Sequence, residues 1–361
     1  MRLNIAKYGL ILLLLLLFRG VQASEPQGIH EEKAEGFNLK EMIFSHVTDA
    51  YDWHLLTVKG HHYSIPLPII VKSESGEWAV FMSSRLAHGE TYKGFSISHS
   101  EKYNNKVVEI NAAGEEVRPL DLSFTKNAAS LMLSVLLMLT LFLSLARSYK
   151  KEPVKARKGF AGMIEVVVVF VQEGLIKPCV GPEYKRFSPY LLTAFFFILI
   201  NNLLGLVPFF PGGANVTGNI SITLVLALCT FAITNLCGNK AYWKEVLWPD
   251  VPLWLKVPIP IMPFVELLGV FTKPFALMIR LFANMLAGHM IILVLMGLIF
   301  IFSYMIGPAV GAGVSVISIA FSIFMLALDI LVSFIQAYVF TMLSAIFIGM
   351  GRMEHEHKEA H

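Results

Sequence analysis

A single arginine lies in a long apolar stretch without another charge near it. Between Lys273 and Asp329, Arg280 is the only formally charged side chain. An arginine at the centre of a bilayer costs about 2.5 to 3.5 kcal/mol on insertion scales, so one found there indicates a function or a partner. Glu266, the nearest acid in the same stretch, is fourteen residues away. We expect the counter-charge to come from another chain; the alternative is an internal carboxylate that fixes packing.

Polar residues follow one line along each of two long apolar segments. At about 100° per residue, the members of the first set fall within about 40° of one line on a helix, and the second set follows a similar stripe. The first set is Glu266, Lys273, Arg280 and Asn284, and the second is Ser322, Asp329, Ser333 and Gln336.

The turn between these segments predicts which polar residues lie at the same depth. Arg280 and Gln336 have their midpoint at residue 308, and His289 and Asp329 at residue 309, both in a Gly-Pro-rich turn. In an antiparallel hairpin, Gln336 then lies level with Arg280, and Asp329 level with His289, roughly 10 to 14 Å nearer the exterior. An imidazole and a carboxylate at one depth can relay protons. The alternative is a buried polar pair that only stabilises the hairpin.

The composition favours lipid as the main solvent. The chain has 361 residues, 55% of them hydrophobic and 15% charged, with a mean hydropathy of +0.63. A soluble domain carries about 25% charged residues. The net charge of +3 is too small to indicate a nucleic-acid surface, and no basic block is interleaved with aromatic residues as such a surface needs.

The first part of the chain is predicted to be exported. Residues 1–23 are predicted to be a signal peptide. The apolar run Gly9–Phe18 is too short to span a membrane, and Ala23 ends a cleavage site of small residues. The alternative is an uncleaved anchor. Residues 24–127 read as a small β-rich exterior domain. A metal site among its histidines is the weaker interpretation. The predicted strands are Tyr63–Val71, Trp78–Met82, Phe95–Ser98 and a hairpin of Lys106–Ile110 with Glu115–Arg118 around Asn111–Gly114.

Residues 128–351 are predicted to form the membrane domain. The basic cluster after residue 146 marks the cytoplasmic side, and residues 162–176 suit an interfacial helix. Four prolines keep residues 252–263 non-helical or kinked. The last two spans are each about twice the length a perpendicular crossing needs, which implies strong tilt. The spans are 128–146, 190–210, 220–237, 264–303 and 314–351, before a cytoplasmic tail at 352–361.

The expected fold is therefore an all-α polytopic membrane protein with five crossing helices, the last two long and tilted in a hairpin. A small β-rich N-terminal domain lies outside.

One segment resembles a known sequence pattern. The segment Lys273–His289, with Arg280 at its centre, resembles the signature of subunit a of F-type ATP synthases. Asp329 to Phe340, Asn201-Asn202 and Asn215–Thr217 resemble further neighbourhoods of that family, whereas residues 24–127 fall outside the resemblance.

The resemblance implies the mechanism of that family. Two offset half-channels pass protons to and from a carboxylate on a rotating ring of c subunits, and Arg280 favours the ionised carboxylate and blocks leakage. Such a chain is not an enzyme on its own and needs no cofactor or metal. The resemblance also implies a location in a bacterial inner membrane, with a periplasmic N-terminal domain and a cytoplasmic C-terminus. The implied partners besides the c ring are a b-subunit stalk and, indirectly, the F1 sector. The implied ion-translocation residues are Glu266, Arg280, Asn284, His289, Asp329 and Gln336.

Two other classes of protein fit less well. A secondary transporter needs duplicated halves with broken helices, which the sequence lacks. An intramembrane hydrolase needs a nucleophile or metal motif, and none occurs in the spans. Whether the ion is a proton or sodium, the number of c subunits, and the roles of residues 24–127 and of the histidine-rich tail stay open.

Overall fold

The computed structural model describes residues 22–23, 49–58, 61–98, 100, 102–103, 105–111, 114–151, 158–207, 212–248 and 261–352. Most of the predicted signal peptide, most of the proline-rich segment 252–263 and the tail after residue 352 lie outside the described residues. The chain divides into two compact units, Met1–Leu133 with Val207–Ala214, and Ser134–Leu206 with Asn215–His361.

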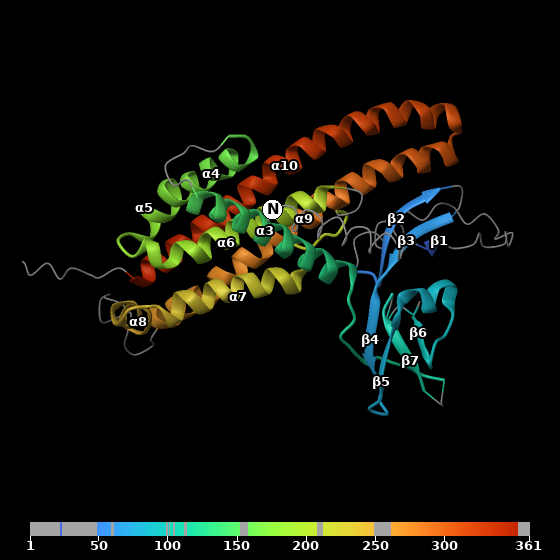
Figure 1. Cartoon of the computed structure of the whole chain (residues 1–361), viewed down its shortest axis with the longest axis horizontal. Helices are drawn as coiled ribbons and strands as arrows, with labels where there is room; N and C mark the ends of the chain where they lie inside the picture. Colours follow the sequence, from blue (N-terminus) through green and yellow to red (C-terminus); the bar gives the residue numbers. More distant parts are fainter. Residues whose placement is uncertain are drawn as a thin grey trace, which may run out of the picture. The chain divides into compact units, whose positions relative to one another are not determined.

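The described part of the first unit contains three antiparallel sheets of three strands each, in the orders β1-β3-β2, β5-β4-β9 and β6-β7-β8 (Figure 1 labels β1 to β7). A 3-10 helix, Ser83–Gly89, follows β5. The strands are β1 (Gln22–Ala23), β2 (Asp52–Val58), β3 (His61–Pro66), β4 (Pro68–Lys72), β5 (Trp78–Met82), β6 (Phe95–Ile97), β7 (Val107–Ile110), β8 (Glu116–Val117) and β9 (Leu120–Asp121).

The strand predictions were right where alternation was clear and wrong at two prolines. The predicted strand Trp78–Met82 is confirmed as β5, and pairing of Ile110 with Glu116 confirms the β7–β8 hairpin. The single strand predicted over Tyr63–Val71 is wrong, because β3 and β4 belong to different sheets. Pro66 and Pro68 cannot donate to a ladder, and the N–H of Leu67 between them bonds the Ser83 hydroxyl instead, at 3.1 Å.

Inward-facing side chains of β4 and β5 form the centre of the first unit's core. Ile69, Val71, Ala79 and Phe81 alternate inward along the two strands and are buried. Tyr51, 4% exposed, closes this core and donates its hydroxyl hydrogen to Asp121. Burial, together with this bond and the Asp121 charge, raises the pKa of Tyr51 well above its usual value.

The second unit is helical. Four described helices, α3, α6, α9 and α10, are long and apolar enough to cross a membrane, and α7 with α8 forms a fifth candidate bent by 103°. The chain is thus mostly helical, with four or five candidate spans in its described part. The helices are α3 (Lys126–Lys151), α4 (Phe160–Val171), the π-helical η2 (Gln172–Ile176), α5 (Lys177–Val180), α6 (Tyr184–Leu206), α7 (Ile220–Leu236), α8 (Lys240–Leu247), α9 (Ile261–Met305) and α10 (Pro308–Arg352).

Helices α9 and α10 run side by side, joined by a two-residue turn (Figure 1). Each has 45 residues, which is about 68 Å of helix at 1.5 Å per residue. Both are longer than expected at each end. The Gly-rich start predicted as a loop is helical from Pro308, which stands at a first-turn position where its missing N–H has no helical partner to lose. Gly307, with φ of 121°, makes the turn.

The main core of the second unit is an apolar cluster. It joins α4, η2, α5 and α6 to the middle of α9 and to the last half of α10, and Phe195, Leu281 and Phe340 lie within it. The segment predicted as an interfacial helix at 162–176 forms α4 and η2, and Val171, Leu175 and Ile176 bury its inner side. It is absent from the candidate spans of the described chain.

The last residue of α10 fastens that helix to its neighbours. Arg352 forms an ion pair with Glu183, and its Nη1 donates to the Cys237 carbonyl at 3.0 Å and to Asn239 Oδ1 at 2.8 Å. In return, Asn239 Nδ2 donates to the Arg352 carbonyl at 3.1 Å and the Asn239 N–H to the Gly351 carbonyl at 2.8 Å. These bonds satisfy carbonyl groups that a helix C-terminus leaves without partners.

Candidate functional site

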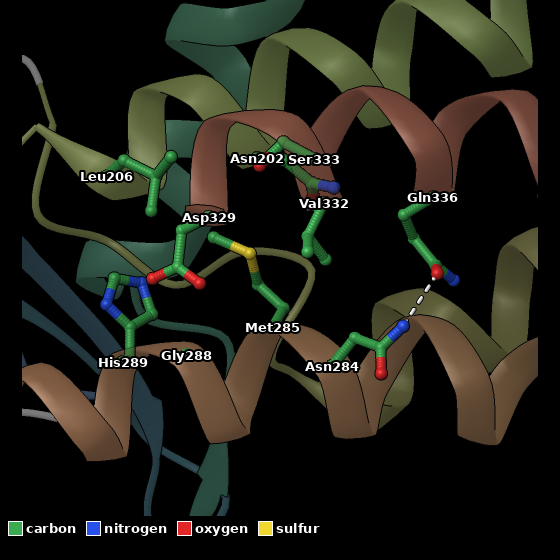
Figure 2. A pocket seen from close by; sticks show the side chains of 10 residues that line it. All are labelled: Asn202, Leu206, Asn284, Met285, Gly288, His289, Asp329, Val332, Ser333 and Gln336. Carbon is green, nitrogen blue, oxygen red and sulfur yellow. Dashed lines mark hydrogen bonds between the residues drawn. The ribbon is translucent and has the colours of Figure 1, made fainter. Parts of the chain in front are cut away.

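An open cavity of about 290 Å³ lies where the polar stripes of α9 and α10 meet the end of α6 (Figure 2). Its walls combine carboxylate, imidazole, amide and hydroxyl groups inside an otherwise apolar bundle. The lining residues are Asn202, Leu206, Asn284, Met285, Gly288, His289, Asp329, Val332, Ser333 and Gln336.

Asn284 and Gln336 form the inner end of this group. Asn284 Nδ2 donates to Gln336 Oε1 at 2.8 Å, and Gln336 is only 4% exposed (Figure 2). The expected register placed Gln336 level with Arg280. The side chain of Gln336 instead reaches Asn284, one helical turn nearer the cavity than Arg280. Asp329 lies against Gly288, beside His289, so the expected pairing of the two helices is kept there.

His289 and Asp329 lie together in the same cavity. Their side chains point toward one another from α9 and α10 (Figure 2). Gly288 makes this approach possible, because a Cβ there would be 2.9 Å from Asp329 Oδ1 and 3.0 Å from Oδ2. Asp329 Oδ2 is buried and has no hydrogen-bond partner among the described residues. The structure therefore joins the two titratable groups that the turn placed at one depth.

The back wall of the cavity comes from a second polar pair. Asn202, 1% exposed near the end of α6, accepts a hydrogen bond at Oδ1 from the hydroxyl of Thr217, at 2.6 Å. Thr217 is fully buried in the segment before α7. Ser333, one turn from Asp329 on α10, is also buried and lines the cavity. Asn202 and Ser333 therefore add an amide and a hydroxyl group to the lining of the cavity.

Arg280 and Glu266 lie outside the cavity. The Arg280 side chain is exposed on α9, and it makes no hydrogen bond or ion pair with any residue that the structure describes. Glu266 is half-buried in the first turns of α9, fourteen residues before Arg280. Of the six predicted site residues, the structure brings together Asn284, His289, Asp329 and Gln336.

Three residues that line the cavity were not predicted as site residues. Asn202 stood out as a pair of asparagines in an apolar span, but nothing in the sequence connected it with His289. Ser333 appeared on the polar stripe without a role. Gly288 gave no signal, because only the packed structure shows which side chain needs the space that its missing Cβ leaves.

Comparisons with known proteins agree with one another. A family model described as ATP synthase A chain matches residues 128–349, and one described as a domain of unknown function (DUF8433) matches residues 42–127. The chain is 42% identical over 254 residues to ATP synthase subunit a of Chloroherpeton thalassium, covering 68% of this chain and 72% of the relative.

Two further relatives carry the same name. ATP synthase subunit a of Chlorobium phaeobacteroides is 41% identical over 286 residues, covering 75% of this chain and 79% of its own. That of Myxococcus xanthus is 45% identical over 249 residues, covering 66% and 77%. The matched region contains every residue of the cavity, together with Arg280 and Glu266. The chain belongs to the ATP synthase subunit a family.

Proposed function

We propose that this chain is the proton-translocating subunit of the membrane sector of an ATP synthase. It provides two half-channels that pass protons to and from a carboxylate on a ring of c subunits, and so couples ion flow to rotation and ATP synthesis. Family membership and the shared name of the relatives support this. The chain is a non-catalytic subunit, because the ring carboxylate and the nucleotide sites belong to other chains.

The observation that carries the proposal is the position of Arg280. A guanidinium on the exposed side of an apolar helix, with no described partner in its own chain, is complementary to a carboxylate presented by a neighbour. In this role it stabilises the ionised ring carboxylate as it passes. It also keeps the two half-channels from exchanging protons along the ring surface, because a fixed positive charge repels a proton.

The cavity supports the half-channel on the exterior side. His289 and Asp329 exchange protons there, and Asn284, Gln336 and the wall at Asn202 supply polar groups that hold water. Glu266 lies toward the other end of α9 and serves the cytoplasmic exit.

The same proposal fixes topology and partners. The membrane domain crosses a bacterial inner membrane five times, counting α7 with α8 as one crossing. The N-terminal unit is periplasmic and the C-terminus cytoplasmic, in accord with the basic residues after α3. The c ring and the b-subunit stalk contact the chain directly, and the F1 sector is reached indirectly.

The test compares two arginines in membranes that contain the whole complex. We expect Arg280→Ala to abolish ATP-driven proton pumping while the complex still assembles. Arg186→Ala is the matched control, because Arg186 is exposed at the start of α6, away from the cavity, and this variant should pump normally. Normal pumping by Arg280→Ala would refute the proposal.

A further inference from the structure

A second polar cavity lies in the same unit. It is an open cavity with about 330 Å³ of empty space, and it is built by α7, α8, α9 and α10. Its polar lining includes Thr230, Thr234, Asn235, Tyr242 and Lys273, and the Tyr242 hydroxyl donates to Asn235 Oδ1 at 3.2 Å.

The two cavities share two walls, so the distance between them can be counted along the helices. On α9 the first ends at Asn284 and the second begins at Pro274, ten residues or about 15 Å away. On α10 the corresponding residues are Gln336 and Phe347, eleven residues apart. Only this short interval separates two groups of polar side chains in one chain.

The start of the interval is apolar and closely packed. Leu277 is 2% exposed, Leu281 and Ala337 are 0%, and Phe340 is 1%. All four belong to the main apolar cluster of the unit, together with Phe195 of α6. A layer without polar groups breaks any chain of hydrogen bonds, and bringing an ion into it costs several kcal/mol.

Hydroxyl groups return immediately beyond this layer. Thr341 is fully buried, and its Oγ1 has no hydrogen-bond partner among the described residues. Ser344, also fully buried, is 3.2 Å from Thr230 Oγ1, which lines the second cavity and is 2.8 Å from the Tyr190 hydroxyl. On α10 the layer from Gln336 to Thr341 is therefore about 7.5 Å thick at 1.5 Å per residue.

Arg280 cannot close a route through this interior. It is exposed, whereas Leu281, the next residue, points about 100° away into the core. We propose that Leu277, Leu281 and Phe340 form an apolar seal that keeps the two polar cavities of this chain from joining. The seal rests on the proposed function: it blocks a leak inside the chain, as Arg280 blocks one along the ring.

Passive proton conductance tests the seal. Vesicles holding the whole complex are treated with a hydrophobic carbodiimide, which modifies the ring carboxylates and stops transport through the ring. We expect Leu281→Ser to raise the remaining conductance about tenfold, equivalent to about 1.4 kcal/mol of barrier. Leu175→Ser is the matched control, since Leu175 is 2% exposed in the same cluster but outside the interval, and it should cause no rise. Equal conductance in the two variants would overturn the seal.

Cysteine labelling tests the seal without transport. Single cysteines replace Ala337 in the layer, Ser333 in the first cavity and Thr234 in the second, in a background without the native Cys179, Cys229 and Cys237. A water-soluble maleimide should label the two cavity positions and leave position 337 unmodified. Labelling of position 337 at the cavity rate would show a wet interval and overturn the seal, even where Arg280→Ala still abolishes pumping. The expected labelling together with normal pumping by Arg280→Ala would support the seal and refute only the proposed function.

Discussion

The side-chain amide of Asn284 donates to Oε1 of Gln336, joining α9 to α10 at the inner end of the first cavity. A buried amide that loses its partner carries the full cost of desolvation, about 1 to 3 kcal/mol. This bond therefore fixes the register in which the polar stripes of the two helices meet.

Removing either amide should have the same effect. We expect Gln336→Leu and Asn284→Ala each to lower the rate of ATP-driven proton pumping several-fold, because each leaves one amide without its partner in the polar wall. The double variant should be no slower than the worse single variant, with a coupling energy of about 1 kcal/mol in a double-mutant cycle. Strictly additive effects would show that the two residues act independently.

Asp329 should control how transport depends on pH. We expect Asp329→Leu to slow proton translocation and to alter its pH profile, because the cavity then keeps only His289 as a titratable group. Ser322→Ala is the control: Ser322 lies on the same stripe of α10 but does not line the cavity, so its variant should keep the wild-type profile. An unchanged profile for Asp329→Leu would exclude Asp329 from the pathway.

Gly349 should not accept a side chain. A Cβ at this position of α10 would clash with the backbone carbonyl oxygen of Cys179, which a rotamer change cannot move. We expect Gly349→Ala to lower the free energy of unfolding by about 1 to 3 kcal/mol, as overpacking does.

Gly313→Ala, in the same helix with nothing within 4 Å of the added Cβ, should be neutral or stabilise by up to about 1 kcal/mol. Thermal unfolding of the purified complex in detergent measures both variants. Equal melting temperatures would contradict the close approach of α10 and α5.

Tyr51 should make the N-terminal unit sensitive to alkaline pH. Its folded-state pKa is raised, so its contribution to stability is fully present below the unfolded value of about 10 and is lost as the pH rises above it. Tyr51→Phe removes the bond to Asp121 and should cost about 1 kcal/mol at neutral pH.

The same substitution should weaken the alkaline loss. Near-ultraviolet circular dichroism of the full chain during denaturant titrations at pH 7 and pH 11 measures both effects. A wild-type chain and a Tyr51→Phe chain that lose equal stability between the two pH values would show that another group titrates.

The sequence predicted what depends on strong periodicity. The position of the turn placed His289 level with Asp329, and the structure brings both into one cavity. Alternation identified β5 with its correct bounds. Both patterns are local, so one stretch of residues contains all the information they need.

Features that depend on packing between distant segments were not predicted. The side-chain bond from Asn284 to Gln336 was not predicted, because it depends on how far each side chain reaches between the packed helices. Prolines divided a predicted strand into two sheets at Leu67, where the competing partner is Ser83, sixteen residues away. The second cavity uses Thr230, Tyr242 and Lys273, which no single helix face contains.

The fastening at Arg352 has a mechanical consequence. In a rotary complex, sideways force on α10 accumulates along its length, and a beam fixed at one end delivers such a load to its support. Arg352 holds that end to Glu183, before α6, and to Cys237 and Asn239, between α7 and α8. Under the proposed function, a load on this end of α10 therefore passes to the segments beside α6, α7 and α8.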